Sequence, residues 1–203
     1  MTSTLTRPTG AELRGFTREG VEALSRAKGE PSWVLEQRLA AWDVYEATPM
    51  PTQQDEEWRR TSLRSLKLDQ VQPFGPEQVV AASLEDLPAV VREGVSREGR
   101  AGLLVQHNSG LVYAWLSDEL KAQGVILMGL DEAVREHPEL VRRYFMTDAV
   151  TPAHDKFSAL HGAFWSGGTF LYVPRNVNIE TPIQTRVYAD ADAPAIFAHT
   201  LIV

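Results

Sequence analysis

The alternation of side chains between Val177 and Val187 constrains the fold of this chain more than any other feature. The odd positions carry only valine, isoleucine or threonine, and the even positions carry asparagine, glutamate, proline, glutamine and arginine. A period of two is typical of a β-strand with one face toward a core and one face outward. Because proline cannot donate to a strand ladder, Pro174 and Pro182 divide the region into short strands. We therefore expect short rungs whose odd positions point inward.

A helix is expected directly before these strands, and two glycines separate it from them. Phe157, Leu160 and Phe164 recur at helical spacing within residues 154–165. Ser166-Gly167-Gly168 then ends the helix, since glycine adopts the positive φ favoured at a helix C-terminus. The G-x-S-x-G nucleophile elbow needs a strand before it and a helix after it, which is the reverse of this order. We interpret the three residues as a turn without catalytic function.

The first 150 residues are expected to be rich in helices, with a small hairpin-containing part. Thr17, Ser32 and Asp131 stand where helix N-caps are favoured, and Pro138 is expected to divide the helix that Asp131 begins. The polar residues before about Gly15 are expected to be frayed. The expected helices cover residues 17–29, 32–47, 55–66, 83–94, 117–124 and 131–146, and the expected strands cover 102–116 (a hairpin around 107–110), 125–130 and 196–203.

Composition excludes several classes of function. The 203 residues contain no cysteine, which excludes disulfides, thiolate zinc sites, cysteine-ligated iron–sulfur clusters and cysteine nucleophiles within them. The formal net charge is -7 and no run of lysine or arginine occurs, so we expect no nucleic-acid or anionic-membrane surface. The first residues lack a signal-peptide pattern, and no window approaches the roughly 18 apolar residues of a membrane span. We expect a soluble, cytoplasmic protein.

Five histidines are the candidates for acid–base or metal chemistry. His154 and His161 flank one expected helix, but their spacing places them about 10 Å apart along its axis. Position 158 between them is a serine, so no strong third ligand would help one metal ion to bridge that distance. His199 lies in the last expected strand, and we expect its partners beyond residue 203. These spacings favour structural or surface histidines over metal ligands.

The remaining candidates are also interpreted as structural. Asp190 and Asp192 could form a calcium pair or a carboxylate dyad, but two acids in an Ala-Pro-rich loop are typical of a solvated turn. No catalytic, cofactor-binding or metal-binding residue is assigned. Two histidines at turn positions are expected to be solvated, and three tryptophans at helical spacings are expected to pack in a core: His107, His137, Trp33, Trp42 and Trp58.

The chain stops at Leu201-Ile202-Val203, inside an apolar strand without a turn, charge or cap. Unpaired strand edges recruit other chains. We therefore expect these residues to be the front part of a longer protein or a truncated piece of one. We also expect self-association through the open strand edge.

Residues Asp155 to Gln184 resemble the SufB/SufD family, the scaffold proteins of the SUF iron–sulfur cluster assembly machinery. The family pattern is a helix rich in alanine and phenylalanine, then W-x-G-G-x-F-x-Y-V-P, a basic residue and P-[IL]-Q. This chain carries it as Trp165 to Pro174, then Arg175, then Pro182 to Gln184. SufD is the better fit within the family. Further agreement lies in Pro31 to Trp33, Arg38, Pro49 to Pro51, Trp58 to Thr61 and His199 to Val203.

The resemblance implies both a fold and a role. The fold is α+β, with a helix-rich N-terminal domain over residues 1–150 that includes a small hairpin-containing part. Residues 151–203 would be a connecting helix and the first rungs of a right-handed parallel β-helix. The role is a non-catalytic scaffold subunit that acts with a SufB-like paralogue and a SufC-like ABC ATPase, which binds the ATP. The complex handles iron–sulfur clusters, but no cofactor is expected in these residues.

Two other classes of β-helical protein are competing hypotheses. A polysaccharide-active β-helix enzyme would need clustered acidic and basic residues on one outer face of successive rungs, and the rungs here are too few to judge. A hexapeptide-repeat acyltransferase would need a repeated [LIV]-G-x-x-x-x period, which is absent. The scaffold remains the preferred hypothesis, with the polysaccharide enzyme as its alternative.

Overall fold

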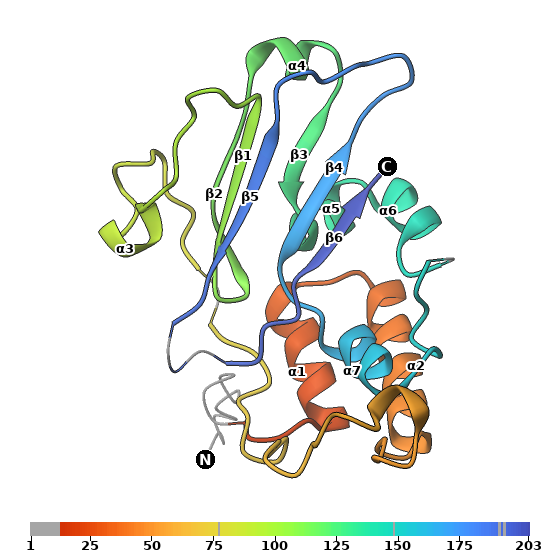
Figure 1. Cartoon of the computed structure of the whole chain (residues 1–203). Coiled ribbons are helices and arrows are strands. Elements are labelled where there is room, and N and C mark those ends of the chain that lie inside the picture. The colour runs from red at the N-terminus through yellow and green to blue at the C-terminus, as the bar shows by residue number, and fades with distance from the viewer. Residues whose placement is uncertain (1–12, 77, 148, 191, 193) are drawn as a thin grey trace, which may run out of the picture.

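The computed structural model describes residues 13–76, 78–147, 149–190, 192 and 194–203. The expectation of a frayed start falls mostly on residues outside these ranges. Across the described residues, α1, α2 and α7 gather at one end of the molecule, and two small sheets form the other end (Figure 1). The helices are α1 (Arg18–Lys28), α2 (Ser32–Ala47), α3 (Ala89–Arg92), α4 (Asp118–Ala122), α5 (Leu130–Glu136), α6 (Pro138–Tyr144) and α7 (Lys156–Phe164). The strands are β1 (Gly102–His107), β2 (Gly110–Leu116), β3 (Ile126–Gly129), β4 (Gly168–Tyr172), β5 (Ile183–Tyr188) and β6 (His199–Ile202).

The helical end is built by α1, α2 and α7, which share one apolar core. The Thr17 hydroxyl accepts a hydrogen bond from Gly20 N, and Gly29 ends α1 with a φ of 60°, so both predicted ends of this helix are confirmed. Ser32 was predicted to cap α2, and this is wrong. Pro31 occupies the cap position instead, because its fixed φ already sets the extended entry into the helix. The core includes Val21, Leu24, Ala41, Trp42, Leu160 and Phe164.

Two predicted helices are much shorter than expected. The helix predicted from Asp55 is reduced to a 3₁₀ turn at Glu56–Trp58, and the one predicted over residues 83–94 is reduced to α3. In both places an aspartate side chain bonds locally to residues before it. Asp55 accepts from Thr52, and Asp86 accepts from Ser83, so each closes a turn that competes with the helix.

The helices around the sheets follow their sequence signals in part. Ser117 caps α4, and Pro138 separates α5 from α6, as predicted. Asp131 was predicted to cap α5, but Gly129 holds the cap position and Asp131 lies inside the first turn. Its carboxylate instead accepts hydrogen bonds from Lys28 Nζ and Gly167 N, which tie α5 to α1 and to the start of β4.

Each sheet combines an antiparallel pair with a parallel one. The predicted hairpin is confirmed as β1 and β2, and β5 adds to β1 in parallel, which gives the order β2-β1-β5. In the second sheet β4 lies antiparallel to β3 and parallel to β6, in the order β3-β4-β6. The two sheets contact each other through an apolar cluster that includes Leu116, Leu127, Leu171 and Ile183. Both sheets take strands from each side of residue 150. The domain boundary there and the β-helix both stay predictions.

The predicted inward face of the alternating region is wrong beyond Ile183. Val177, Ile179 and Ile183 do pack against the core between the sheets, but only residues from Ile183 onward form a strand. In that strand Thr185 is exposed and Val187 is 47% exposed. The even-numbered residues of β5 are the covered ones, because they face the segment that contains α3. Arg186 lies against Gly94 of this segment, where an added Cβ atom would be 2.9 Å from Arg186 Nη1. Tyr188 packs against the apolar cluster that contains Val91 of α3.

Candidate functional site

The site lies where α7 ends, β4 begins and β6 passes beside them. Gly167 and Gly168 form the connection, with φ values of 68° and 120°. A Cβ atom on Gly168 would overlap the carbonyl oxygen of His199, and one on Gly167 would overlap Gln106 Nε2 and the carbonyl oxygen of Ser109. The positive φ of both glycines is as predicted, but their predicted role in ending the helix is wrong, because Trp165 holds the C-cap of α7 with a φ of -51°. The two glycines are needed because backbone and buried side chains approach more closely than any Cβ would permit.

Ser166 shows no sign of nucleophile chemistry. Its side chain is fully buried, and its hydroxyl has no hydrogen-bond partner among the described residues. A catalytic serine needs a base within hydrogen-bonding distance. The interpretation of residues 166–168 as a structural turn therefore agrees with the surroundings of the hydroxyl.

Two histidines meet at this junction. His161 Nε2, on α7, lies 3.0 Å from His199 Nδ1, at the start of β6. The prediction that the partners of His199 lie beyond residue 203 is wrong, because α7 and β6 both adjoin β4 and bring the rings together. Aromatic edges close around the pair: Phe145 lies 4.9 Å from the His199 ring and Phe197 lies 6.0 Å from the His161 ring, between centroids.

Both histidines are neutral at pH 7. Burial and, to a smaller extent, the neighbouring His161 together lower the pKa of His199 to about 4. Burial also lowers the pKa of His161, with an added contribution from the positive charge of Arg38. The pair therefore consists of two neutral imidazoles in which one ring donates and the other accepts.

We predict that this pair makes stability depend on pH in the mildly acidic range. An unfolded histidine titrates near 6.5, whereas folded His199 titrates near 4, so between these values the unfolded state binds more protons. The free energy of unfolding should therefore fall as pH falls from 6.5 to about 4. We expect a loss of about 2 kcal/mol, since solvent reaches part of the ring and screens the shift. Urea unfolding at a series of pH values measures it.

The matched variants for this prediction are His199→Gln and His154→Gln. His154 is exposed, and its nearest charged partner is its own neighbour Asp155 at 3.8 Å. His199→Gln should flatten the pH dependence of unfolding, and His154→Gln should leave it unchanged. The same slope in wild type and His199→Gln would contradict the assignment.

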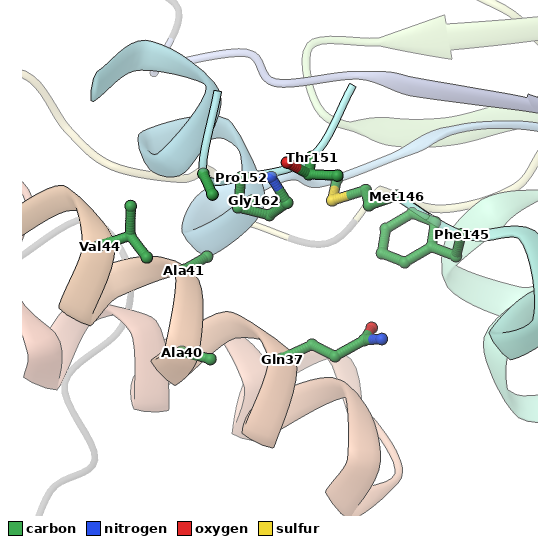
Figure 2. Close-up of a pocket in the computed structure, with 10 residues that line it drawn as sticks. Gln37, Ala40, Ala41, Val44, Phe145, Met146, Thr151, Pro152 and Gly162 are labelled. Atoms are coloured by element: carbon green, nitrogen blue, oxygen red, sulfur yellow. The ribbon is translucent and has the colours of Figure 1, made fainter. Parts of the chain in front are cut away.

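The histidine pair forms part of the wall of a cavity of about 390 Å³. A second cavity, of about 260 Å³, lies beside it between α2 and residues 145–146 and 151–153 (Figure 2). Figure 2 shows Gln37, Ala40, Ala41 and Val44 along α2, with Phe145, Met146 and Pro152 on the other side. The two cavities share Met146, Thr151 and Pro152. The first cavity is further lined by Trp58, Val150, Asp155, Phe157 and Ser158.

The buried Arg38 side chain on α2 contacts both the connection between α1 and α2 and the end of α7. Both nitrogens Nε and Nη2 of Arg38 bond to the carboxylate of Glu30, at 2.8 and 2.6 Å, and both side chains are 0% exposed. The third group, Nη1, donates to the carbonyl oxygen of Ala163, and the guanidinium lies 4.3 Å above the Trp165 ring. The two bonds to Glu30 fix Arg38 against the connection between α1 and α2, and the bond to Ala163 joins α2 to α7.

The other sequence candidates lie apart from this site. His107 Nε2 lies 2.7 Å from Asp190 Oδ2, and Asn108 donates to the same oxygen, so Asp190 fastens the hairpin to the end of β5. These hydrogen bonds, first from Asn108 and then from His107, lower the pKa of Asp190. Asp192 is an exposed turn residue. The other aromatic candidates from the sequence also make packing contacts: His137 with Phe170, Trp42 in the helical core, Trp33 at the edge of a second core cluster and Trp58 with Phe157.

The described part of the chain shows neither a metal-binding group nor a membrane-spanning helix. No group there of three or more histidine, cysteine, aspartate or glutamate side chains could hold a metal ion. None of the helices there is long and apolar enough to cross a membrane.

Comparisons with known proteins agree with the motif around the two glycines. The family model described as "SufBD protein N-terminal region" matches residues 101–185, which extend from β1 into β5. The chain is 36% identical over 201 residues to an iron–sulfur cluster assembly SufBD family protein of Mycobacterium tuberculosis, covering 94% of this chain and 23% of the relative. It is 32% identical over 199 residues to iron–sulfur cluster assembly protein SufB of Bacillus subtilis, covering 94% of this chain and 41% of the relative.

A third relative shows the same partial coverage. An iron–sulfur cluster assembly SufBD family protein of Staphylococcus epidermidis is 34% identical over 200 residues, covering 94% of this chain and 41% of the relative. The chain thus spans less than half the length of each of these three relatives. One relative is named SufB and the others carry only the joint family name, so the two paralogues are not distinguished. With the family model and the relatives in agreement, this chain belongs to the SufB/SufD family of iron–sulfur cluster assembly proteins.

Proposed function

We propose that the gene product containing this chain is a non-catalytic scaffold subunit of SUF iron–sulfur cluster assembly. The observation that carries the proposal is the similarity over 94% of the chain to proteins named for that assembly. The site geometry is consistent with it. The glycine turn and the histidine pair join α7 to strands, and buried Arg38 joins α2 to α7, as a rigid scaffold requires.

The strand order supports a β-helical continuation of the fold. The chain passes from β4 in one sheet to β5 in the other and back to β6, and each later strand adds in parallel to its sheet. Strands β5 and β6 each form an edge of their sheet (Figure 1). We propose that this pattern is the opening of a right-handed parallel β-helix, in which further strands would add at these two edges.

Within the family we propose a SufD-like role in the cytoplasm, together with a SufB-like paralogue and a SufC-like ABC ATPase. The helical start and the hairpin-containing region before the glycine turn support the SufD-like assignment. The scaffold would carry no ATPase activity of its own, because the ATPase partner would supply nucleotide hydrolysis. Iron–sulfur clusters would be the cargo of the complex.

Depletion of the gene product tests the assembly role in cells. We expect the activity of [4Fe–4S] dehydratases to fall several-fold, while the amount of their polypeptides stays constant, and we expect the wild-type gene to restore it. The alternative, a polysaccharide-active β-helix enzyme, predicts that dehydratase activity is unchanged and that growth on a polymeric sugar is lost. The second pattern would contradict the scaffold proposal.

A further inference from the structure

We infer that the cavity beside His161 and His199 binds a small uncharged aromatic molecule that carries one hydroxyl group. The inference is independent of the assembly role proposed above. It rests on three features of the described residues: the hydrogen-bonding capacity of the histidine pair, the pairing of the charges around it, and the apolar and aromatic walls of the cavity.

The histidine pair offers a ligand one donor and one acceptor. The contact between His161 Nε2 and His199 Nδ1 uses one nitrogen of each ring. A neutral imidazole carries a single N–H. The ring that donates within the pair therefore has a lone pair on its outer nitrogen, and the ring that accepts has an outer N–H. Exchange of the tautomers swaps the two roles, but one donor and one acceptor always remain. A hydroxyl group matches both, because it can donate and accept.

The charges near the cavity are already paired. The carboxylate of Asp155 accepts hydrogen bonds from Phe157 N, Ser158 N and Ser158 Oγ. Burial raises the pKa of Asp155, but these bonds outweigh it and the net pKa is lowered, so the group is a satisfied carboxylate at neutral pH. Arg38 is held by Glu30. A charged ligand would therefore find no free counter-charge among these groups.

A metal ion fits this site less well than a neutral ligand. Burial opposes a positive charge on either ring, and the charge of Arg38 opposes it at His161. A divalent ion would place more positive charge beside the same rings. Within the described ranges, no third histidine, aspartate or glutamate completes a metal-binding group. The pair is thus better suited to hydrogen bonding than to coordination.

The walls of the cavity suit an aromatic body. The rings of Trp58 and Phe157 lie 5.3 Å apart between centroids, and both line the cavity with Met146, Val150 and Pro152. The volume of about 390 Å³ is within the range of small-molecule sites. Met146 also has a φ of 51°, in the region that favours glycine. Such strain is concentrated at functional sites, and here it falls on a residue that lines both neighbouring cavities.

The test compares phenol with toluene, its near-isostere without a hydroxyl group. The gene product containing this chain is titrated by NMR, with the His161 and His199 ring signals as the readout. We expect phenol to bind with a Kd of about 1 mM and toluene to bind about ten-fold more weakly. Benzylammonium, benzoate and zinc chloride should each fail to compete with phenol.

The control variants separate recognition from loss of structure. His161→Phe should weaken phenol binding about ten-fold, and His154→Ala should leave it within a factor of about two. His161→Gln, which keeps a donor and an acceptor, should retain most of the affinity, and thermal unfolding should verify that each variant is folded. Equal binding of phenol and toluene would overturn the inference. So would tighter binding of zinc, the same loss in His154→Ala, or no saturation by about 10 mM phenol.

Discussion

Gly168→Ala is expected to destabilise the protein by about 4 kcal/mol or more, and so to lower its thermal midpoint by about 10 °C or more. Two effects combine at this position. The residue has a φ of 120°, which L side chains rarely adopt, and a Cβ atom would overlap the carbonyl oxygen of His199. Strand β6 would have to move away from β4, and the His161–His199 contact would be lost with it. Calorimetry and the histidine ring NMR signals measure the two consequences.

Gly29→Ala is the matched control for this substitution. Gly29 also has a positive φ, of 60°, but nothing lies within 4 Å of the place where its Cβ would be. Gly29→Ala should therefore lower stability only by the cost of placing alanine in a left-handed backbone conformation, about 1 kcal/mol. A comparable loss of stability in Gly29→Ala and Gly168→Ala would show that the positive φ alone requires glycine at position 168. That result would contradict the close approach of β6 to the turn.

Arg38→Met is expected to cost about 3–5 kcal/mol, because it leaves the carboxylate of Glu30 buried without its partner. It also removes the hydrogen bond to Ala163 O, where α2 meets the end of α7. Glu30→Gln should cost a similar amount, because it leaves the guanidinium of Arg38 buried without its partner. The double variant should cost less than the sum of the two, since no unpaired charge then remains. Denaturant unfolding of the four proteins gives the coupling energy.

The Arg18–Asp43 pair is the control for burial. Its nitrogen–oxygen distance is 2.6 Å, the same as the shortest contact between Arg38 and Glu30, but its side chains are 50% and 62% exposed. Arg18→Met should therefore cost less than about 1 kcal/mol. Equal losses in Arg18→Met and Arg38→Met would show that the buried pair has no special role in joining α2 to α7.

Local signals in the sequence predicted much of the helical end and the turns. Thr17 and Gly29 mark both ends of α1 because a cap depends only on residues within one turn. Pro138 and the hairpin around residues 107–110 are equally local, and both appear where they were predicted. The Asp155 cap of α7 was not predicted, although it too acts within a single turn, through Phe157 N and Ser158 N.

The predictions that were wrong concern residues whose surroundings are set by a segment distant in the sequence. The alternation after Ile183 correctly indicates a strand, but the choice of inner face is decided by the segment around α3, which covers Tyr188 and leaves Val187 exposed. Asp131 looks like a cap, but Lys28 and Gly167 draw its carboxylate away. No period or spacing specifies such partners.

The histidine pair was missed for the same reason. His161 lies on a helix and His199 on a strand 38 residues later, so neither helical nor strand spacing relates them. The information lies in the parallel pairing of β4 with β6, which returns the chain to the end of α7. A β-helix would have predicted this contact, since each new strand of a β-helix lies parallel to a strand of the preceding coil.

Co-purification tests the scaffold proposal most directly. The gene product containing this chain, tagged and expressed from its own locus, should be recovered from its organism with an ABC-type ATPase and a second SufB/SufD family protein. Gly168→Ala should lose both partners if the folded junction is needed to present the scaffold. Recovery of the folded wild-type protein without any ABC-type ATPase would contradict the proposed role in SUF assembly.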